Sequence, residues 1–199
     1  MSDNSDLINA ENFRDVTKWF LRYILITSCR YTRDKNILAY IGLYCLISTY
    51  QWLKNSRDDT YIGYVIDTML ETVAQDVTAS PAKAETIFDG KLLTGNTSAV
   101  ETIYALNQLP SLQRQIVVLY DIEMLTTAQL QQLIGISIQQ VRAELKTAEE
   151  SVEQCLGKIN PSFGSVIEQI NVTGTMMDMD LIGTIAQSAG EYIDKELQG

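Results

Sequence analysis

The chain has 199 residues, of which 46% are hydrophobic and 20% are charged, and its formal net charge is −10. This composition allows one medium or two small hydrophobic cores, and it excludes a disordered chain, which would be poorer in apolar residues. The sequence has no histidine and only three scattered cysteines, Cys29, Cys45 and Cys155. A metal site therefore has little support, and buried reduced thiols are the favoured interpretation.

The negative charge is uneven along the chain. Residues 1–75 hold 8 basic and 9 acidic side chains, whereas residues 76–199 hold 7 basic and 16 acidic side chains. Proteins that bind nucleic acid usually carry an excess of Lys and Arg, which neutralise phosphates. The acidic second part therefore argues against strong, autonomous binding to DNA.

Apolar periodicity predicts three helices in the first part of the chain, starting with residues 12–32. Asp34 is placed to cap a second helix that runs to residue 53, and a third helix covers residues 60–77. The uncharged stretch 36–53 contains Tyr, Ser, Thr and Gln, and its apolar part is too short to span a bilayer. We therefore expect a buried helix there and no membrane span. A basic row lies opposite the apolar side of the first helix: Arg14, Lys18 and Arg22.

Residues 78–98 are rich in Pro, Gly, Ser and Thr and are typical of a linker. A helical pattern resumes in residues 99–157. In the extension that follows, the pattern of residues 163–174 is ambiguous, and residues 179–197 form an amphipathic helical pattern. From this apolar register we expect the extension to fold back on the second helical domain and cover its DNA-facing side.

The centre of the second part has the outline of a helix-turn-helix. Thr126 or Thr127 is placed to cap a short helix, and Gly135 provides the left-handed residue that ends it. Ser137, with Gln140 three residues later, forms a capping box for the next helix. The inward stripe of that helix is Ile138, Val141, Leu145, Ala148 and Val152. Two short helices joined in this way are a common means of placing a helix in the major groove.

Residues 106–145, LNQLPSLQRQIVVLYDIEMLTTAQLQQLIGISIQQVRAEL, resemble without a gap the domain of extracytoplasmic-function-type sigma factors that binds the promoter −35 element. The matches that carry the resemblance are Leu109-Pro110, Gln113-Arg114, the apolar run 116–119, Asp121, Glu123, Leu125, Leu130, residues 133–137, Val141 and Leu145. The first three predicted helices are similar to the first domain of the same family, with Tyr61 and Tyr64 at its aromatic pair. Four positions depart from that pattern: Tyr40, Leu43, Ile62 and Asp67.

The resemblance implies an all-α chain with two small helical domains. The first, residues 1–77, corresponds to the polymerase-binding and −10-binding domain, and residues 78–98 are the linker. Residues 99–157 are the helix-turn-helix domain, and residues 158–199 are the C-terminal extension. The implied candidates for DNA contact are Ser137, Gln139, Gln140, Arg142, Ala143 and Lys146. The implied candidates for binding RNA polymerase or another partner are Tyr40, Ile41, Tyr44, Tyr61 and Tyr64.

The charge of the predicted recognition helix leaves two hypotheses open. Residues 137–156 contain two basic and four acidic side chains, and Glu144, predicted to face outward, stands where relatives carry a basic residue. Gln139 and Gln140 could bind adenine edges, or they could simply solvate the start of the helix. The first hypothesis is a divergent sigma-factor-like regulator that binds RNA polymerase and, within that complex, promoter DNA. The alternative is a protein–protein interaction module that has kept the fold and lost DNA binding, as a competitor or adaptor.

Nothing in the sequence supports an enzyme. Without histidine the chain lacks the commonest general base, and it has no glycine-rich phosphate loop. We therefore expect no catalytic residues and no cofactor. The first dozen residues are acidic and polar, unlike a signal peptide, so we also expect a cytoplasmic location.

Overall fold

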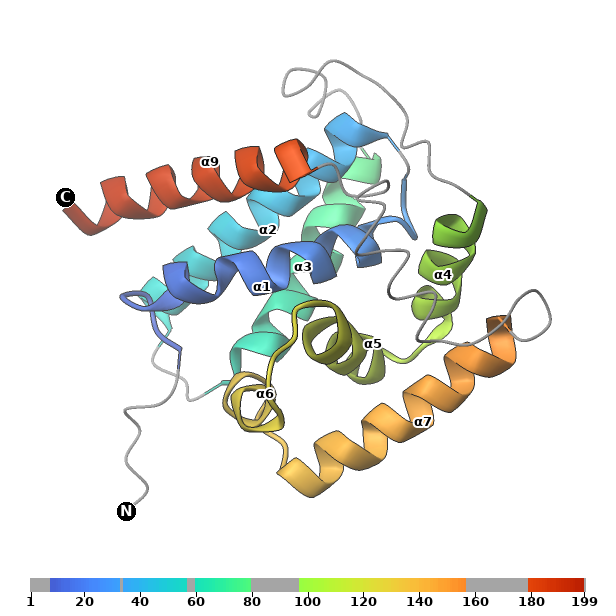
Figure 1. Ribbon diagram of the computed structural model, residues 1–199. Coiled ribbons are helices and arrows are strands. Elements are labelled where there is room, and N and C mark those ends of the chain that lie inside the picture. Colours follow the sequence, from blue (N-terminus) through green and yellow to red (C-terminus); the bar gives the residue numbers. More distant parts are fainter. Residues whose placement is uncertain (1–7, 33, 57–59, 80–96, 157–178, 199) are drawn as a thin grey trace.

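The computed structural model describes residues 8–32, 34–56, 60–79, 97–156 and 179–198. Within these ranges the chain is helical and contains no strand, which confirms the predicted all-α fold (Figure 1). In chain order the elements are α1 (Phe13–Ser28), α2 (Lys35–Asn55), α3 (Ile62–Ala79), α4 (Thr97–Gln108), α5 (Ser111–Val117), the π-helical turn η3 (Val118–Ile122), α6 (Thr127–Ile134), α7 (Ile138–Leu156) and α9 (Met179–Gln198).

Helices α1, α2 and α3 pack on one another, and α2 lies in the middle of the group. The predicted cap of α2 is present, because the Asp34 carboxylate accepts hydrogen bonds from the backbone N–H groups of Asn36 and Ile37 at 2.8 and 3.2 Å. The uncharged stretch 36–53 within α2 is explained by packing against α1, α3 and α9. Within the described ranges, none of the helices combines the length and the apolar character needed to cross a bilayer.

Helices α4 to α7 form a second group, in which α7 packs across α4, α5 and α6. Pro110 precedes α5 and occupies a position where its missing N–H is not needed. The inward side of α7 buries Val141, Ala148 and Val152, as its apolar spacing predicts, and it also buries Leu156. Ile138 and Leu145, at the edge of the same stripe, are half-buried.

The two helix groups share one continuous hydrophobic core. Two amide side chains cross the boundary: the Asn107 Nδ2 donates to the carbonyl of Ile26 at 2.9 Å, and the Gln115 Nε2 donates to the carbonyl of Gly63 at 3.0 Å. Arg22 of α1 also pairs with Glu123 at the end of η3, at 3.1 Å. The helix-turn-helix group is therefore held against α1 and α3 by specific polar contacts as well as by packing.

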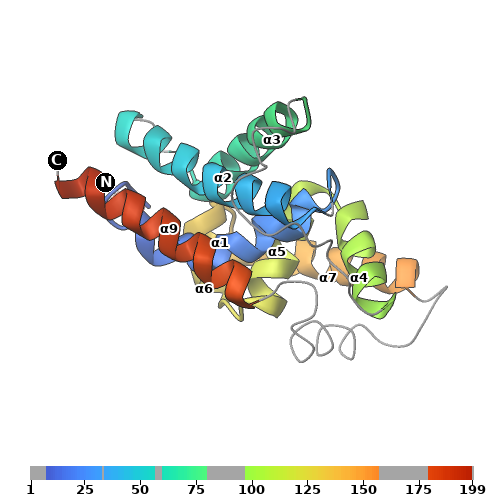
Figure 2. The ribbon, with the colours of Figure 1, turned by 90° about the horizontal axis from the view of Figure 1, so that it is seen from above.

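The expectation that the C-terminal extension covers the second helix group is wrong for helix α9. This helix lies along α1 and α2 instead, as two views of the ribbon agree (Figures 1 and 2). Ile185, Ala189 and Ile193 are buried in this contact. A Cβ on Gly42 of α2 would lie 3.3 Å from side-chain carbons of Leu21 and Leu25 in α1, which is a tight contact, and 3.4 Å from the Ile185 Cδ1 in α9. The ambiguous segment 163–174 and most of the predicted linker lie outside the described residues.

Candidate nucleic-acid interface

The helix-turn-helix predicted from the sequence is present as α6, a tight turn and α7. Thr126 caps α6: its Oγ1 accepts from the Gln129 backbone N–H at 3.3 Å, and the Gln129 Oε1 accepts from the Thr126 N–H at 2.9 Å. Gly135 ends α6 with φ of 81°, in the left-handed region that glycine adopts without a steric penalty. The chain turns at this residue, and α7 starts three residues later.

The turn between α6 and α7 rests on the start of α3. A Cβ added to Gly135 would collide with the ring of Tyr61, so this glycine is required by packing as well as by its backbone angle. Tyr61 was predicted to bind a partner, and 39% of the residue is still exposed. The ring of Tyr61 packs against Gly135 and so supports the turn.

A second capping box begins α7. The Gln140 backbone N–H donates to the Ser137 Oγ at 3.2 Å, and the Gln140 Oε1 accepts from the Ser137 N–H at 3.0 Å. A bidentate contact to adenine needs both the oxygen and the nitrogen of a glutamine amide. Because its oxygen is already used by the cap, Gln140 could make such a contact only by giving up the capping bond.

The remaining predicted DNA-contact residues share one side of α7. Gln139, Arg142, Ala143 and Lys146 are exposed, whereas Ser137 is half-buried at the helix start. The Lys146 Nζ lies 3.9 Å from the Glu150 Oε1. Both side chains are well exposed, so this ion pair leaves the ammonium group available to solvent. This side of α7 therefore has the exposure that a DNA-contacting helix needs, and it carries two cationic side chains.

Glu144 does not face outward, contrary to the prediction from the helical spacing. It is half-buried, and its Oε2 accepts a hydrogen bond from the Gln113 Nε2 of α5 at 2.9 Å. Glu149 is also half-buried, and burial followed by the nearby charge of Glu153 raises its pKa. These two carboxylates belong to the α7 packing surface, so the exposed side of α7 is less acidic than its sequence suggests.

The five predicted partner-binding residues do not form one surface. Ile41 is fully buried in the core of the α1–α2–α3 group, so it is not available to a partner, and its inclusion was wrong. Tyr40 and Tyr44 stack on each other on α2, with ring centroids 4.1 Å apart. Tyr64 is 70% exposed and lines the same groove as Ile134 and Ile136 of the helix-turn-helix.

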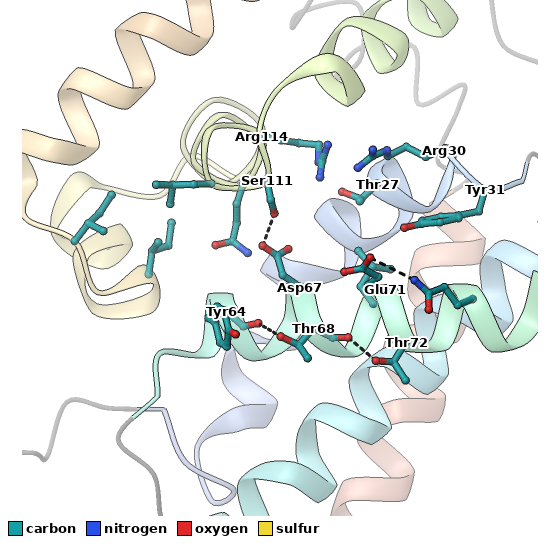
Figure 3. Close-up of a pocket in the computed structure, with 16 residues that line it drawn as sticks. Thr27, Arg30, Tyr31, Tyr64, Asp67, Thr68, Glu71, Thr72, Ser111 and Arg114 are labelled. Carbon is teal, nitrogen blue, oxygen red and sulfur yellow. Dashed lines mark hydrogen bonds between the residues drawn. The ribbon is translucent and has the colours of Figure 1, made fainter.

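A groove of about 790 Å³ runs between the two helix groups, and sequence reasoning missed it (Figure 3). Its walls come from the end of α1, from α3, from α5 and from the α6–α7 turn. Thr27, Arg30 and Arg114 line it together although more than 80 positions separate the first from the last. The only local sequence feature that pointed to a groove residue was the Gln113-Arg114 match of the family resemblance. That match does not predict which helix the Arg114 side chain will face.

The cysteines and acidic residues give no sign of metal binding in the part of the chain that the structure describes. No group of three or more potential ligand side chains is found there. None of the three cysteines, all of which lie in the described ranges, forms a disulfide bond, and burial raises the pKa of the Cys45 thiol, which makes it a poor ligand and nucleophile. Of the three thiols that were predicted to be buried, Cys45 is buried, whereas Cys29 and Cys155 are half-buried.

Residues 100–152, which extend from α4 through most of α7, match the family model described as sigma-70, region 4. No curated protein and no solved structure matches the chain. The match supports the resemblance to sigma factors of the extracytoplasmic-function type for the helix-turn-helix group. The resemblance of the first three helices to the first domain of that family stays a prediction.

Proposed function

We propose, from the premise that residues 100–152 form a sigma-70 region 4-like domain, that this protein is a divergent sigma-factor-like regulator of transcription initiation. It binds RNA polymerase core, and α7 contacts promoter DNA within that complex. The observation that carries the proposal is the complete helix-turn-helix, with two capping boxes and Gly135 at the turn, inside the matched segment.

The DNA contact is assigned to the exposed side of α7. Arg142 and Lys146 supply phosphate contacts, and Gln139, whose amide is not used by a cap, is the best placed of the two glutamines for a base edge. Two cationic side chains are few for a DNA-binding helix, since each phosphate contact contributes about one unit to the salt dependence of binding. Polymerase is therefore needed to supply most of the affinity.

Polymerase binding is assigned to the α1–α2–α3 group, where Tyr40 and Tyr44 form an aromatic pair on α2 with Tyr44 40% exposed. Exposed aromatic side chains are enriched in protein interfaces because they bury a large area for little conformational entropy. The placement follows the resemblance of this group to the first sigma domain.

The proposal is tested by retention of the purified full-length chain on RNA polymerase core at low and at high salt, followed by transcription from promoter DNA. Arg142→Glu should reduce promoter-dependent initiation and leave retention on core intact. Lys195→Glu, the same charge change on the exposed side of α9, is the matched control and should affect neither. Tyr44→Ala should weaken retention, whereas Tyr104→Ala, which removes a 60% exposed ring from α4, should not.

A second candidate function is a protein-binding module that has kept the region 4 fold without DNA binding. It is favoured by the engaged oxygen of Gln140 and by the net acidity of residues 76–199. Retention on polymerase with no effect of Arg142→Glu on any promoter would support this alternative. Absence of retention at low salt would contradict the first proposal.

A further inference from the structure

The groove between the helix groups contains two buried hydrogen-bond donors that have no partner among the residues that the structure describes. Arg114 is 2% exposed; one of its terminal nitrogens donates to the Leu109 carbonyl at 3.2 Å, but its Nε has no partner. Thr27 is 4% exposed, and its Oγ1 also has no partner. Leaving a buried polar group unpaired costs about 1–3 kcal/mol, so most such groups in folded proteins are satisfied. A polar ligand or an ordered water in the groove would satisfy them.

A second guanidinium group faces the same space. Arg30, from the last turn after α1, is exposed and forms no ion pair with the described residues, and its side chain points toward that of Arg114, with Thr27 beside them (Figure 3). Arginine side chains bind the oxygens of phosphate and carboxylate groups through paired N–H donors. This end of the groove therefore has the chemistry of a site for an oxyanion.

The opposite wall, on α3, is not suited to an anion. Asp67 accepts hydrogen bonds from the hydroxyl groups of Tyr23 and Ser111; burial raises its pKa, and the nearby positive charge of Arg114 opposes that shift. Glu71 is exposed, and its Oε1 accepts from the Gln75 Nε2 at 3.3 Å, which leaves its second oxygen as an acceptor. A ligand that is anionic at one end and carries hydrogen-bond donors at the other complements both walls.

The groove also presents an aromatic surface. The ring of Tyr31 lines it beside Arg30, and 37% of this residue is exposed. Stacking of a nucleobase on an aromatic side chain contributes about 1–3 kcal/mol. The volume of about 790 Å³ falls within the range of known small-molecule sites.

We propose that this groove binds a nucleoside phosphate, with its phosphate at Arg30, Arg114 and Thr27 and its base against Tyr31. The exposed carboxylate of Glu71 accepts hydrogen bonds from donors on the base. Because the ligand contacts α1 and α3 on one side and α5 on the other, it binds only when the two helix groups are packed together. The site is separate from the exposed side of α7 and does not depend on DNA or polymerase binding.

The test is isothermal titration calorimetry of the full-length chain with guanosine monophosphate at low ionic strength. Guanosine, which lacks the phosphate, and inorganic phosphate, which lacks the base, should each bind at least about tenfold more weakly, because each loses one half of the contacts. Absence of heat with guanosine monophosphate up to millimolar concentration would overturn the proposal.

Two variants locate the binding. Arg30→Gln should weaken binding about tenfold or more, since a hydrogen bond to a charged group is lost, and its exposed position should leave the fold intact. Arg142→Gln makes the same change on the exposed side of α7, and it should leave the affinity unchanged. If the two variants weakened binding equally, the nucleotide would be attracted by positive charge in general, and the proposed site would be wrong.

Thr27→Val provides a readout that a purely structural role would not give. The change preserves the shape of the side chain and removes a hydroxyl that has no protein partner. The melting temperature of the ligand-free protein should therefore stay the same or rise, while the affinity for guanosine monophosphate should fall severalfold. A variant with unchanged stability and unchanged affinity would exclude Thr27 from the phosphate site and contradict the assignment.

Discussion

The ring of Tyr61, at the start of α3, occupies the space where any residue other than glycine at position 135 would place its Cβ. A residue more than 70 positions away therefore restricts position 135 to glycine. Gly135 ends the first helix of the helix-turn-helix, and Tyr61 supports the turn from the other helix group. The orientation of α7 relative to α1 and α3 depends in part on this contact.

Gly135→Ala should destabilise the protein by about 2–4 kcal/mol, because the new methyl group meets both a left-handed backbone and the Tyr61 ring. Chemical denaturation measures the loss. Gly183→Ala is the control: this glycine lies in α9 with no atom near its Cβ position, so alanine should stabilise the helix slightly. Combining Gly135→Ala with Tyr61→Ala should recover the part of the loss that comes from collision. Strictly additive effects would contradict the contact.

Asp121 should make stability depend on pH. Its Oδ2 is buried and has no partner among the described residues, and burial, with a smaller contribution from the charge of Glu149, raises its pKa to about 6. The folded state therefore binds this proton more tightly than the unfolded state, whose pKa is near 3.8. The associated stability is present below about pH 4 and is lost as the pH rises to about 6 and above.

Asp121→Asn should consequently stabilise the protein at pH 7 by about 1 kcal/mol, after allowance for solvent screening of a partly exposed group. The advantage should disappear at pH 4, where the native aspartic acid is already neutral. Glu150→Gln, an exposed site on α7, should show no comparable dependence. Denaturation curves at both pH values provide the measurement, and an equal advantage at both would argue against titration of Asp121.

The ion pair between Arg22 and Glu123 should contribute to the packing of the two helix groups. Both side chains are largely buried, and burial raises the pKa of Glu123 while Arg22 opposes that shift. Arg22→Gln should cost about 1–3 kcal/mol, since it leaves a carboxylate unpaired in a poorly solvated position. A double-mutant cycle with Glu123→Gln should give a favourable coupling energy.

The exposed pair Lys54–Glu196 is the control for that cycle, because both of its side chains are substantially solvated. Its disruption by Lys54→Gln should have no measurable effect on unfolding. A coupling energy near zero would show that the Arg22–Glu123 ion pair does not stabilise the packing of the two helix groups.

Helix α9 should be an integral part of the first helix group. Ile193 is fully buried against α1 and α2, so Ile193→Ala should cost about 2–4 kcal/mol through lost burial and a residual cavity. Leu197→Ala, four residues later and 49% exposed, should cost much less. Thermal unfolding compares them. Equal, small effects would indicate that α9 is dispensable for folding.

Local patterns in the sequence predicted α1, α2, α3, α6, α7 and α9, the caps at Asp34 and Ser137, a cap at Thr126 or Thr127, and the turn at Gly135. These features depend on residues within a few positions of one another, because helical periodicity and capping hydrogen bonds are local. The apolar stripe of α7 was predicted for the same reason, and the ungapped resemblance of residues 106–145 identified the helix-turn-helix group.

The tertiary structure decided which surface each helix meets. The apolar side of α9 was recognisable from its spacing, but not its position on α1 and α2, because any apolar stripe satisfies the same pattern. Glu144 turned inward because Gln113 of α5 offers it a hydrogen bond, and Ile41 was buried because α2 is enclosed on several sides. Arg30, Arg114 and Thr27 meet only after two helix groups have packed. Burial and pairing between distant segments depend on the three-dimensional arrangement of the whole chain, so local spacing could not predict them.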